Sequence, residues 1–283
     1  MRCLKVMSIC AAIVMAAAPV VPTSAVTSAA QSPAAQSPAA STAATQPKTS
    51  VKASPAFSAV RNPARNAVAS PDYNNPCWAG GAKGAAATST CHSQELAAIN
   101  HQHALEHVRA IVLPGNFWTL APASQIFVIT NLERVSRGLK PVRGVSAQMS
   151  GWATTAARHS ADVSVGAWDL SNGTQLQIFG SVWAGDLNSL DADFIWMYAD
   201  GWSTGGSDNV DCTSATSSGC WGHRQIMLGS YGGSSALVAG VGSLQHFLVG
   251  GALNSDAEAI ANYTGVAPKL TYAWTTAVAA GAR

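Results

Sequence analysis

The sequence predicts an α+β fold, in which helices come first and most strands come last. Apolar residues recur at helical spacing in three successive segments between Ser93 and Val163. The segment from Leu176 to Val182 has the alternation typical of a half-buried strand, and three apolar segments near the C-terminus are also strand-like. Because helices and strands are segregated along the chain, packed α+β layers are favoured over a wound parallel sheet.

Four helices are predicted where an apolar stripe follows a capping residue. Ser93 and Ser124 are suitable N-caps, because a serine hydroxyl accepts a hydrogen bond from the first free backbone N–H groups. Pro114 and Pro141 lie just beyond the first two helices, where proline ends helical structure. The predicted helices cover residues 93–112, 124–139, 146–163 and 189–198.

Three strands are predicted near the C-terminus. Residues 236–244 and 246–253 are separated by very little, which indicates a hairpin. Residues 270–278 form the third predicted strand.

The N-terminal third of the chain is predicted to lie outside the folded domain. Residues 1–30 have basic residues, an apolar stretch and then small residues, which is typical of a secretory signal peptide rather than a transmembrane helix. Residues 31–76 are rich in Ala, Ser and Pro and predict a disordered tether. Residues 77–283 then form one domain, which we expect to be secreted and extracellular, with no transmembrane segment.

The charge of the predicted domain argues against nucleic-acid binding. From Cys77 onward ten basic residues stand against thirteen acidic ones, a net charge of −3. Between Arg158 and Arg224 there are eight aspartates and no Lys or Arg. This stretch is either a solvated acidic face or a cation site, and a calcium-stabilised surface module built on Asp186 to Asp211 is one alternative function.

Four cysteines remain after removal of the signal peptide, and in an oxidising compartment they predict two disulfides. Three pairings are possible. The local pairing, Cys77 with Cys91 and Cys212 with Cys220, closes two short loops. The second loop would fix the backbone just before His223.

A second alternative is a metal-dependent hydrolase or peptidase. His103, Glu106 and His107 fit the H-x-x-E-H pattern of one zinc peptidase class, in which two histidines one helical turn apart bind the metal. His223 with aspartates such as Asp200 and Asp211 is another possible metal-binding group. A divalent cation would be the cofactor in either case, and otherwise no cofactor is expected.

Five motifs follow one another along the second half of the chain. They are NLERVSRGLKPV at 131–142, HSADV at 159–163, VWAG at 182–185, GW at 201–202 and GCWGHRQIML at 219–228. In order and spacing they resemble the CAP superfamily (cysteine-rich secretory, antigen 5 and pathogenesis-related proteins), in particular the SCP-like domains of secreted bacterial proteins. The resemblance implies an α-β-α sandwich with a central, mainly antiparallel sheet and a cleft on one side.

The resemblance carries over only part of the family's cleft. Two histidines and two glutamates line the cleft of well-known relatives, and His223 matches one of these histidines. Gly180 stands where a glutamate belongs, so the resemblance implies no family-type metal site and no catalytic residue in this chain.

The expected function is therefore non-catalytic binding in the cleft. Pockets walled by aromatic rings suit lipids and other small hydrophobic ligands, and a cell-envelope partner is the other candidate. The oligomeric state is left open by the sequence. The predicted cleft residues are His223, Arg224, Trp183, Trp202, Trp221, Asp200 and His159.

Overall fold

A computed structural model describes residues 89–201, 214, 217, 219–231, 236–248 and 253–283. The predicted signal peptide and tether lie outside these residues, as do Cys77, Trp202 and Cys212. Within the described residues, no helix combines the length and the apolar character needed to cross a membrane.

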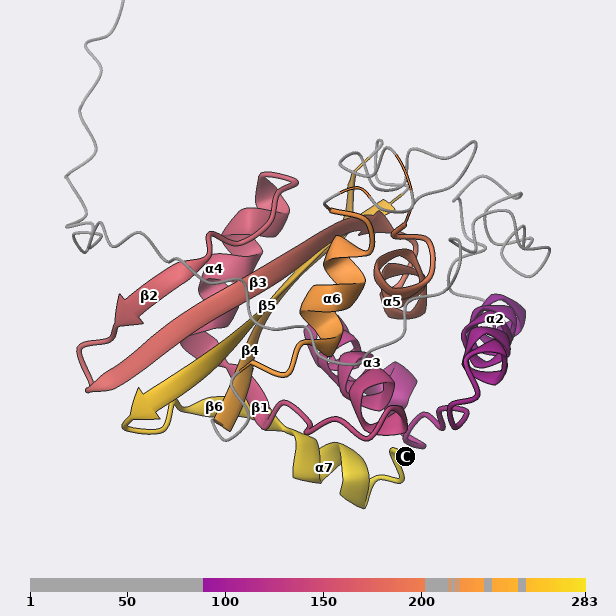
Figure 1. Cartoon of the computed structure of the whole chain (residues 1–283), viewed down its shortest axis with the longest axis horizontal. Helices are drawn as coiled ribbons and strands as arrows, with labels where there is room; N and C mark the ends of the chain where they lie inside the picture. The colour runs from indigo at the N-terminus through magenta and orange to yellow at the C-terminus, as the bar shows by residue number, and fades with distance from the viewer. Residues whose placement is uncertain (1–88, 202–213, 215–216, 218, 232–235, 249–252) are drawn as a thin grey trace, which may run out of the picture. The chain divides into compact units, whose positions relative to one another are not determined.

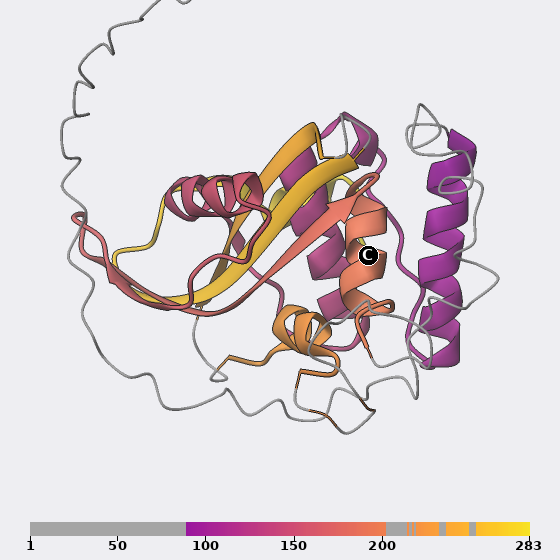
Figure 2. The same cartoon turned by 90° about the horizontal axis from the view of Figure 1, so that it is seen from above.

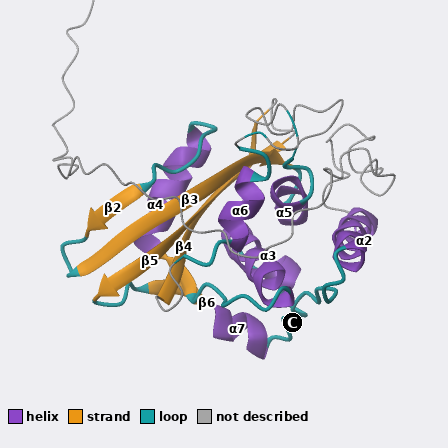
Figure 3. Ribbon diagram, viewed as in Figure 1, coloured by secondary structure: helices purple, strands orange, loops and turns teal. Residues whose placement is uncertain are grey.

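The described chain is an α+β structure built on a mixed six-stranded sheet, as Figures 1 and 3 show. The strands lie side by side in the order β2-β3-β5-β4-β1-β6. β1 runs parallel to β4, whereas the other neighbouring strands are antiparallel. The α+β class predicted from the sequence is thus confirmed. The strands are β1 (Gly144–Ser146), β2 (Gly166–Asp169), β3 (Thr174–Asp186), β4 (Ala236–Leu248), β5 (Leu253–Gly265) and β6 (Leu270–Ala273).

All four predicted helices are present, but α2 and α3 begin before Ser93 and Ser124, the residues predicted as their N-caps, and two helices end well before their predicted ends. α2 ends at Leu105 and α4 at Arg158, both well before the predicted positions. His107 (φ 57°) and Ser160 (φ 51°) adopt the left-handed conformation that terminates helices. The helices are α2 (Ser89–Leu105), α3 (Pro122–Ser136), α4 (Ala147–Arg158), α5 (Ser189–Met197), α6 (Gly222–Leu228) and α7 (Trp274–Ala279), with a short 3₁₀ helix at Phe117–Thr119.

The C-terminal strands differ from the prediction. Residues 246–248 extend β4 instead of opening the second strand of the hairpin, and β5 continues to Gly265. The segment predicted as a last strand divides into β6 and then helix α7, which begins at Trp274.

Helices cover both faces of the sheet. Figure 2 shows α4 on one face and α3, α5 and α6 on the other. The alternation of side chains in β5 follows this division, because Ala259 packs in the apolar cluster beneath α4 and Ile260 packs in the cluster on the opposite face.

Two glycines in β4 allow α4 to lie close to the sheet. A Cβ atom on Gly240 would lie 2.4 Å from the backbone carbon of Met149, and one on Gly242 would lie 2.2 Å from the backbone nitrogen of Thr154. Only glycine fits at such distances.

Candidate functional site

His223 lies at the start of α6, next to the carboxylate of Asp200, which follows α5 by three residues. Its Nδ1 lies 3.1 Å from Oδ1 of Asp200, and 29 % of its side chain is exposed. Oδ2 of Asp200 accepts hydrogen bonds from the backbone N–H groups of His223 (2.6 Å) and Arg224 (3.2 Å). Asp200 therefore caps α6 while also orienting the imidazole.

The predicted aromatic hollow around His223 is not formed by the described residues. Trp221 is 5 % exposed and packs over Gly201. Trp183 donates from Nε1 to Ser255 Oγ (2.9 Å), and this serine donates in turn to a backbone carbonyl at the end of α4. Trp183 thus lies on the α4 face, whereas α6 packs on the opposite face. Because side chains alternate between the two faces along β3, Trp183 lies on the face opposite to α6 and to Trp221. The order of the motifs did not reveal this separation.

Two other predicted cleft residues also lie elsewhere. His159 is exposed at the C-terminal end of α4. The Arg224 side chain is fully buried, and its Nη2 donates to Oε2 of Glu106 at 2.6 Å. Its ion-pair partner is thus Glu106, which follows α2 in the chain.

Glu133 of α3 is the centre of a buried polar network that the sequence analysis missed. Its carboxylate accepts hydrogen bonds from the Tyr198 hydroxyl (2.8 Å) and from Arg137, and it lies 2.9 Å from His103 Nε2. Burial raises the pKa of Glu133, but the charge of Arg137 and then that of His103 outweigh it, so the pKa lies below its usual range. Arg137 also pairs with Glu106, whose Oε2 lies 2.9 Å from its Nη2.

The H-x-x-E-H pattern does not form a metal-binding face. α2 ends before Glu106 and His107, so the helical spacing that the pattern requires is lost. Both ring nitrogens of His103 have other contacts, with Glu133 and with the carbonyl of Arg109 (2.7 Å). No group of three or more His, Cys, Asp or Glu side chains is arranged for a metal ion within the described ranges.

The described aspartates considered for calcium form no metal-binding group either. Asp191 is buried and caps its own turn, accepting a hydrogen bond from the Leu187 N–H at 2.8 Å. Asp186 is buried beside Asp256, and burial together with that neighbour raises the pKa of Asp186 well above its usual value. Asp208 and Asp211 lie outside the described residues.

Glu258 adds a buried carboxyl on the same face as Glu133. It accepts a hydrogen bond from Thr130 Oγ1 at 2.6 Å, and burial raises its pKa to about 8. Glu258 is therefore mostly uncharged at neutral pH.

We expect the free energy of unfolding to fall as pH rises. The raised pKa of Glu258 stabilises the folded protein below the unfolded pKa of 4.5, and this stabilisation is lost as pH rises toward about 8. Urea melts between about pH 5 and about pH 9 give the slope of the unfolding free energy against pH. This slope should be less steep in Glu258→Gln than in the wild-type protein. It should not vanish, because burial also raises the pKa of Glu95 to about 8. Equal slopes in the two proteins would contradict this assignment.

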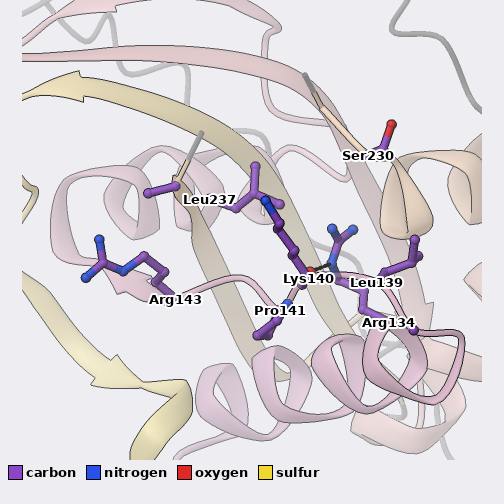
Figure 4. A pocket seen from close by; sticks show the side chains of 9 residues that line it. Arg134, Leu139, Lys140, Pro141, Arg143, Ser230 and Leu237 are labelled. Carbon is purple, nitrogen blue, oxygen red and sulfur yellow. Dashed lines mark hydrogen bonds between the residues drawn. The ribbon is translucent and has the colours of Figure 1, made fainter. Parts of the chain in front are cut away.

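A pocket of about 420 Å³ lies between the end of α3 and the start of β4 (Figure 4). Figure 4 shows the Lys140 side chain extending away from Pro141 toward Leu237, with the Arg134 guanidinium beside it. We call this cavity the Lys140 pocket. Its lining residues are Arg134, Gly138, Leu139, Lys140, Pro141, Arg143, Ser230, Ala236 and Leu237.

The loop that walls the Lys140 pocket is fastened to α3. Asn131 donates from Nδ2 to the Val142 carbonyl (3.0 Å) and accepts from the Val142 N–H (2.7 Å). Arg134 Nε donates to the Lys140 carbonyl (3.0 Å), and its Nη1 donates to the carbonyls of Met227 and Gly229 beside it. The pocket is thus preformed, and Asn131 and Arg134 of the NLER motif build it.

Comparison with protein-family models, with curated proteins and with solved structures finds no match. The choice among functions therefore depends on the geometry of the chain itself.

Proposed function

We propose that this chain is a secreted, CAP/SCP-like binding module that holds a small hydrophobic ligand in the Lys140 pocket and catalyses no reaction. The order of the five motifs supports the family, as do helices on both faces of a mainly antiparallel sheet. The signal-like segment at residues 1–30 supports secretion.

The single observation that carries the binding proposal is the pocket itself. Its volume of about 420 Å³ lies in the range typical of small-molecule sites. Leu139, Pro141 and Leu237 give it apolar walls, and the hydrogen bonds of Asn131 and Arg134 hold those walls in place. A preformed apolar pocket binds its ligand without the cost of ordering a loop.

Titration with the neutral fluorophore N-phenyl-1-naphthylamine tests this function. The full chain should enhance its fluorescence saturably, and Ala236→Trp should abolish the enhancement, because an indole at this half-exposed lining position fills the pocket. Ala167→Trp is the matched control, since Ala167 is exposed on β2 and does not line the pocket. Equal binding by wild type and Ala236→Trp would contradict the proposal.

A further inference from the structure

We propose that the Lys140 pocket contains an anion subsite, and that its ligand is amphipathic, with a carboxylate or phosphate head held by Lys140 and Arg134 and with Arg143 at the rim of the pocket. This inference rests on the proposed binding function and adds the chemical class of the ligand.

The first observation is the charge of the lining. Three of the pocket residues are cationic, Arg134, Lys140 and Arg143, and none is acidic. This contrasts with the predicted domain as a whole, where acidic residues outnumber basic ones. Arg143 is held at the rim by a hydrogen bond from its Nη1 to the Tyr263 hydroxyl (2.6 Å). The excess of positive charge is therefore local to this pocket.

The second observation is that Arg134 is a buried cation with no anionic partner among the described residues. Its side chain is 1 % exposed, and its hydrogen bonds from Nε and Nη1 go to backbone carbonyls. Among the described residues, no carboxylate lies within ion-pairing distance of this guanidinium, and none accepts a hydrogen bond from its Nη2. Buried charges in proteins are usually paired.

The carboxyl group that interacts electrostatically with Arg134 does not neutralise the positive charge of this arginine. Glu258 interacts electrostatically with Arg134, but burial raises the pKa of Glu258 to about 8. At neutral pH this carboxyl is mostly protonated, so the positive charge of Arg134 persists at the pocket. An anionic ligand head would neutralise it with charge-assisted hydrogen bonds.

The third observation is that the cations lie next to apolar surface. Leu139, Pro141, Ala236 and Leu237 share the pocket with them, so a head group bound by the cations has apolar side chains beside its tail. Inorganic phosphate would leave these side chains without contacts. The lining thus matches an amphipathic anion better than a free one.

Isothermal titration calorimetry of the full chain with four probes separates the possibilities: decanoate, decyl phosphate, decanol and inorganic phosphate. Either amphipathic anion should bind at least about tenfold more tightly than decanol, the factor expected from one hydrogen bond to a charged group. Inorganic phosphate should bind weakly. The preference for an anion should fall in Lys140→Gln combined with Arg143→Gln, because only Arg134 of the three cations remains, while decanol binding is kept. Both positions are exposed, so folding should be preserved.

Each other outcome overturns one specific statement. Equal affinity for decanol and both anions would overturn the anion subsite and leave the binding function intact. Failure of all three decyl probes would overturn the binding function itself. Phosphate binding as tight as decyl phosphate would support the cations as a subsite for a free anion and contradict the amphipathic ligand. Arg158→Gln, at an exposed position at the end of α4, is the matched control and should keep the wild-type preference.

Discussion

Replacement of Glu133 by alanine is expected to lower the free energy of unfolding by about 3–5 kcal/mol, the range for removing one partner of a buried ion pair. The carboxylate lies against Arg137, His103 and Tyr198, and it is fully buried. Its removal takes from Arg137 one of its two ion-pair partners among the described residues, and it leaves the His103 and Tyr198 donors without this acceptor. Urea denaturation followed by circular dichroism measures the change.

Asp169→Ala is the control for this measurement, because Asp169 is exposed on β2 and should change stability by less than about 0.5 kcal/mol. If Glu133→Ala proves as harmless as Asp169→Ala, the buried network around Glu133 does not contribute to folding as described.

Gly242→Ala is expected to destabilise the protein by about 1–3 kcal/mol, the usual cost of overpacking. The added methyl group would lie 2.2 Å from the Thr154 nitrogen and 2.4 Å from the Ala153 carbonyl carbon. Both are backbone atoms of α4, so the whole helix must shift away from the sheet to make room.

Gly151→Ala provides a matched control of opposite sign. Gly151 lies within α4 itself, and a Cβ there meets no atom within 4 Å. This substitution should stabilise by about 0.5–1 kcal/mol through helix propensity. Thermal melts of the two variants should therefore move in opposite directions, and a shift in the same direction would contradict the close packing of α4 on β4.

Helix ends were predicted poorly because their terminating residues are not glycines. His107 and Ser160 take left-handed backbone angles, and the N–H of Val108 then bonds to the His103 carbonyl at 2.9 Å. Sequence patterns associate this conformation with glycine or asparagine. The apolar periodicity, by contrast, located α3 well, because Leu132 and its neighbours are fully buried.

Strand β5 was missed because polar residues occupy its interior. Ser255, Asp256 and Glu258 are each no more than 1 % exposed, although such residues normally indicate a loop or a surface. Their burial depends on partners from other elements, such as Thr130 of α3 for Glu258. No local pattern reveals these partners, so both the strand and the buried acids required the fold.

The candidate site was only partly predictable for the same reason. The motifs included the NLER helix, whose Asn131 and Arg134 hold one wall of the pocket, but the pocket forms where residues 138–143 meet the start of β4, nearly a hundred positions along the chain. Glu133 and Arg134 were quoted within a motif, and only the packing of α3 against α5 and α6 assigns their roles.

The most direct test of the central claim is to locate the bound ligand by nuclear magnetic resonance. On addition of N-phenyl-1-naphthylamine, backbone amide shifts should change at residues 138–143, at Ser230 and at residues 236–237, with the proline excepted. Shifts that instead cluster around His223 and Asp200, or no shifts at all, would contradict the assignment of ligand binding to the Lys140 pocket.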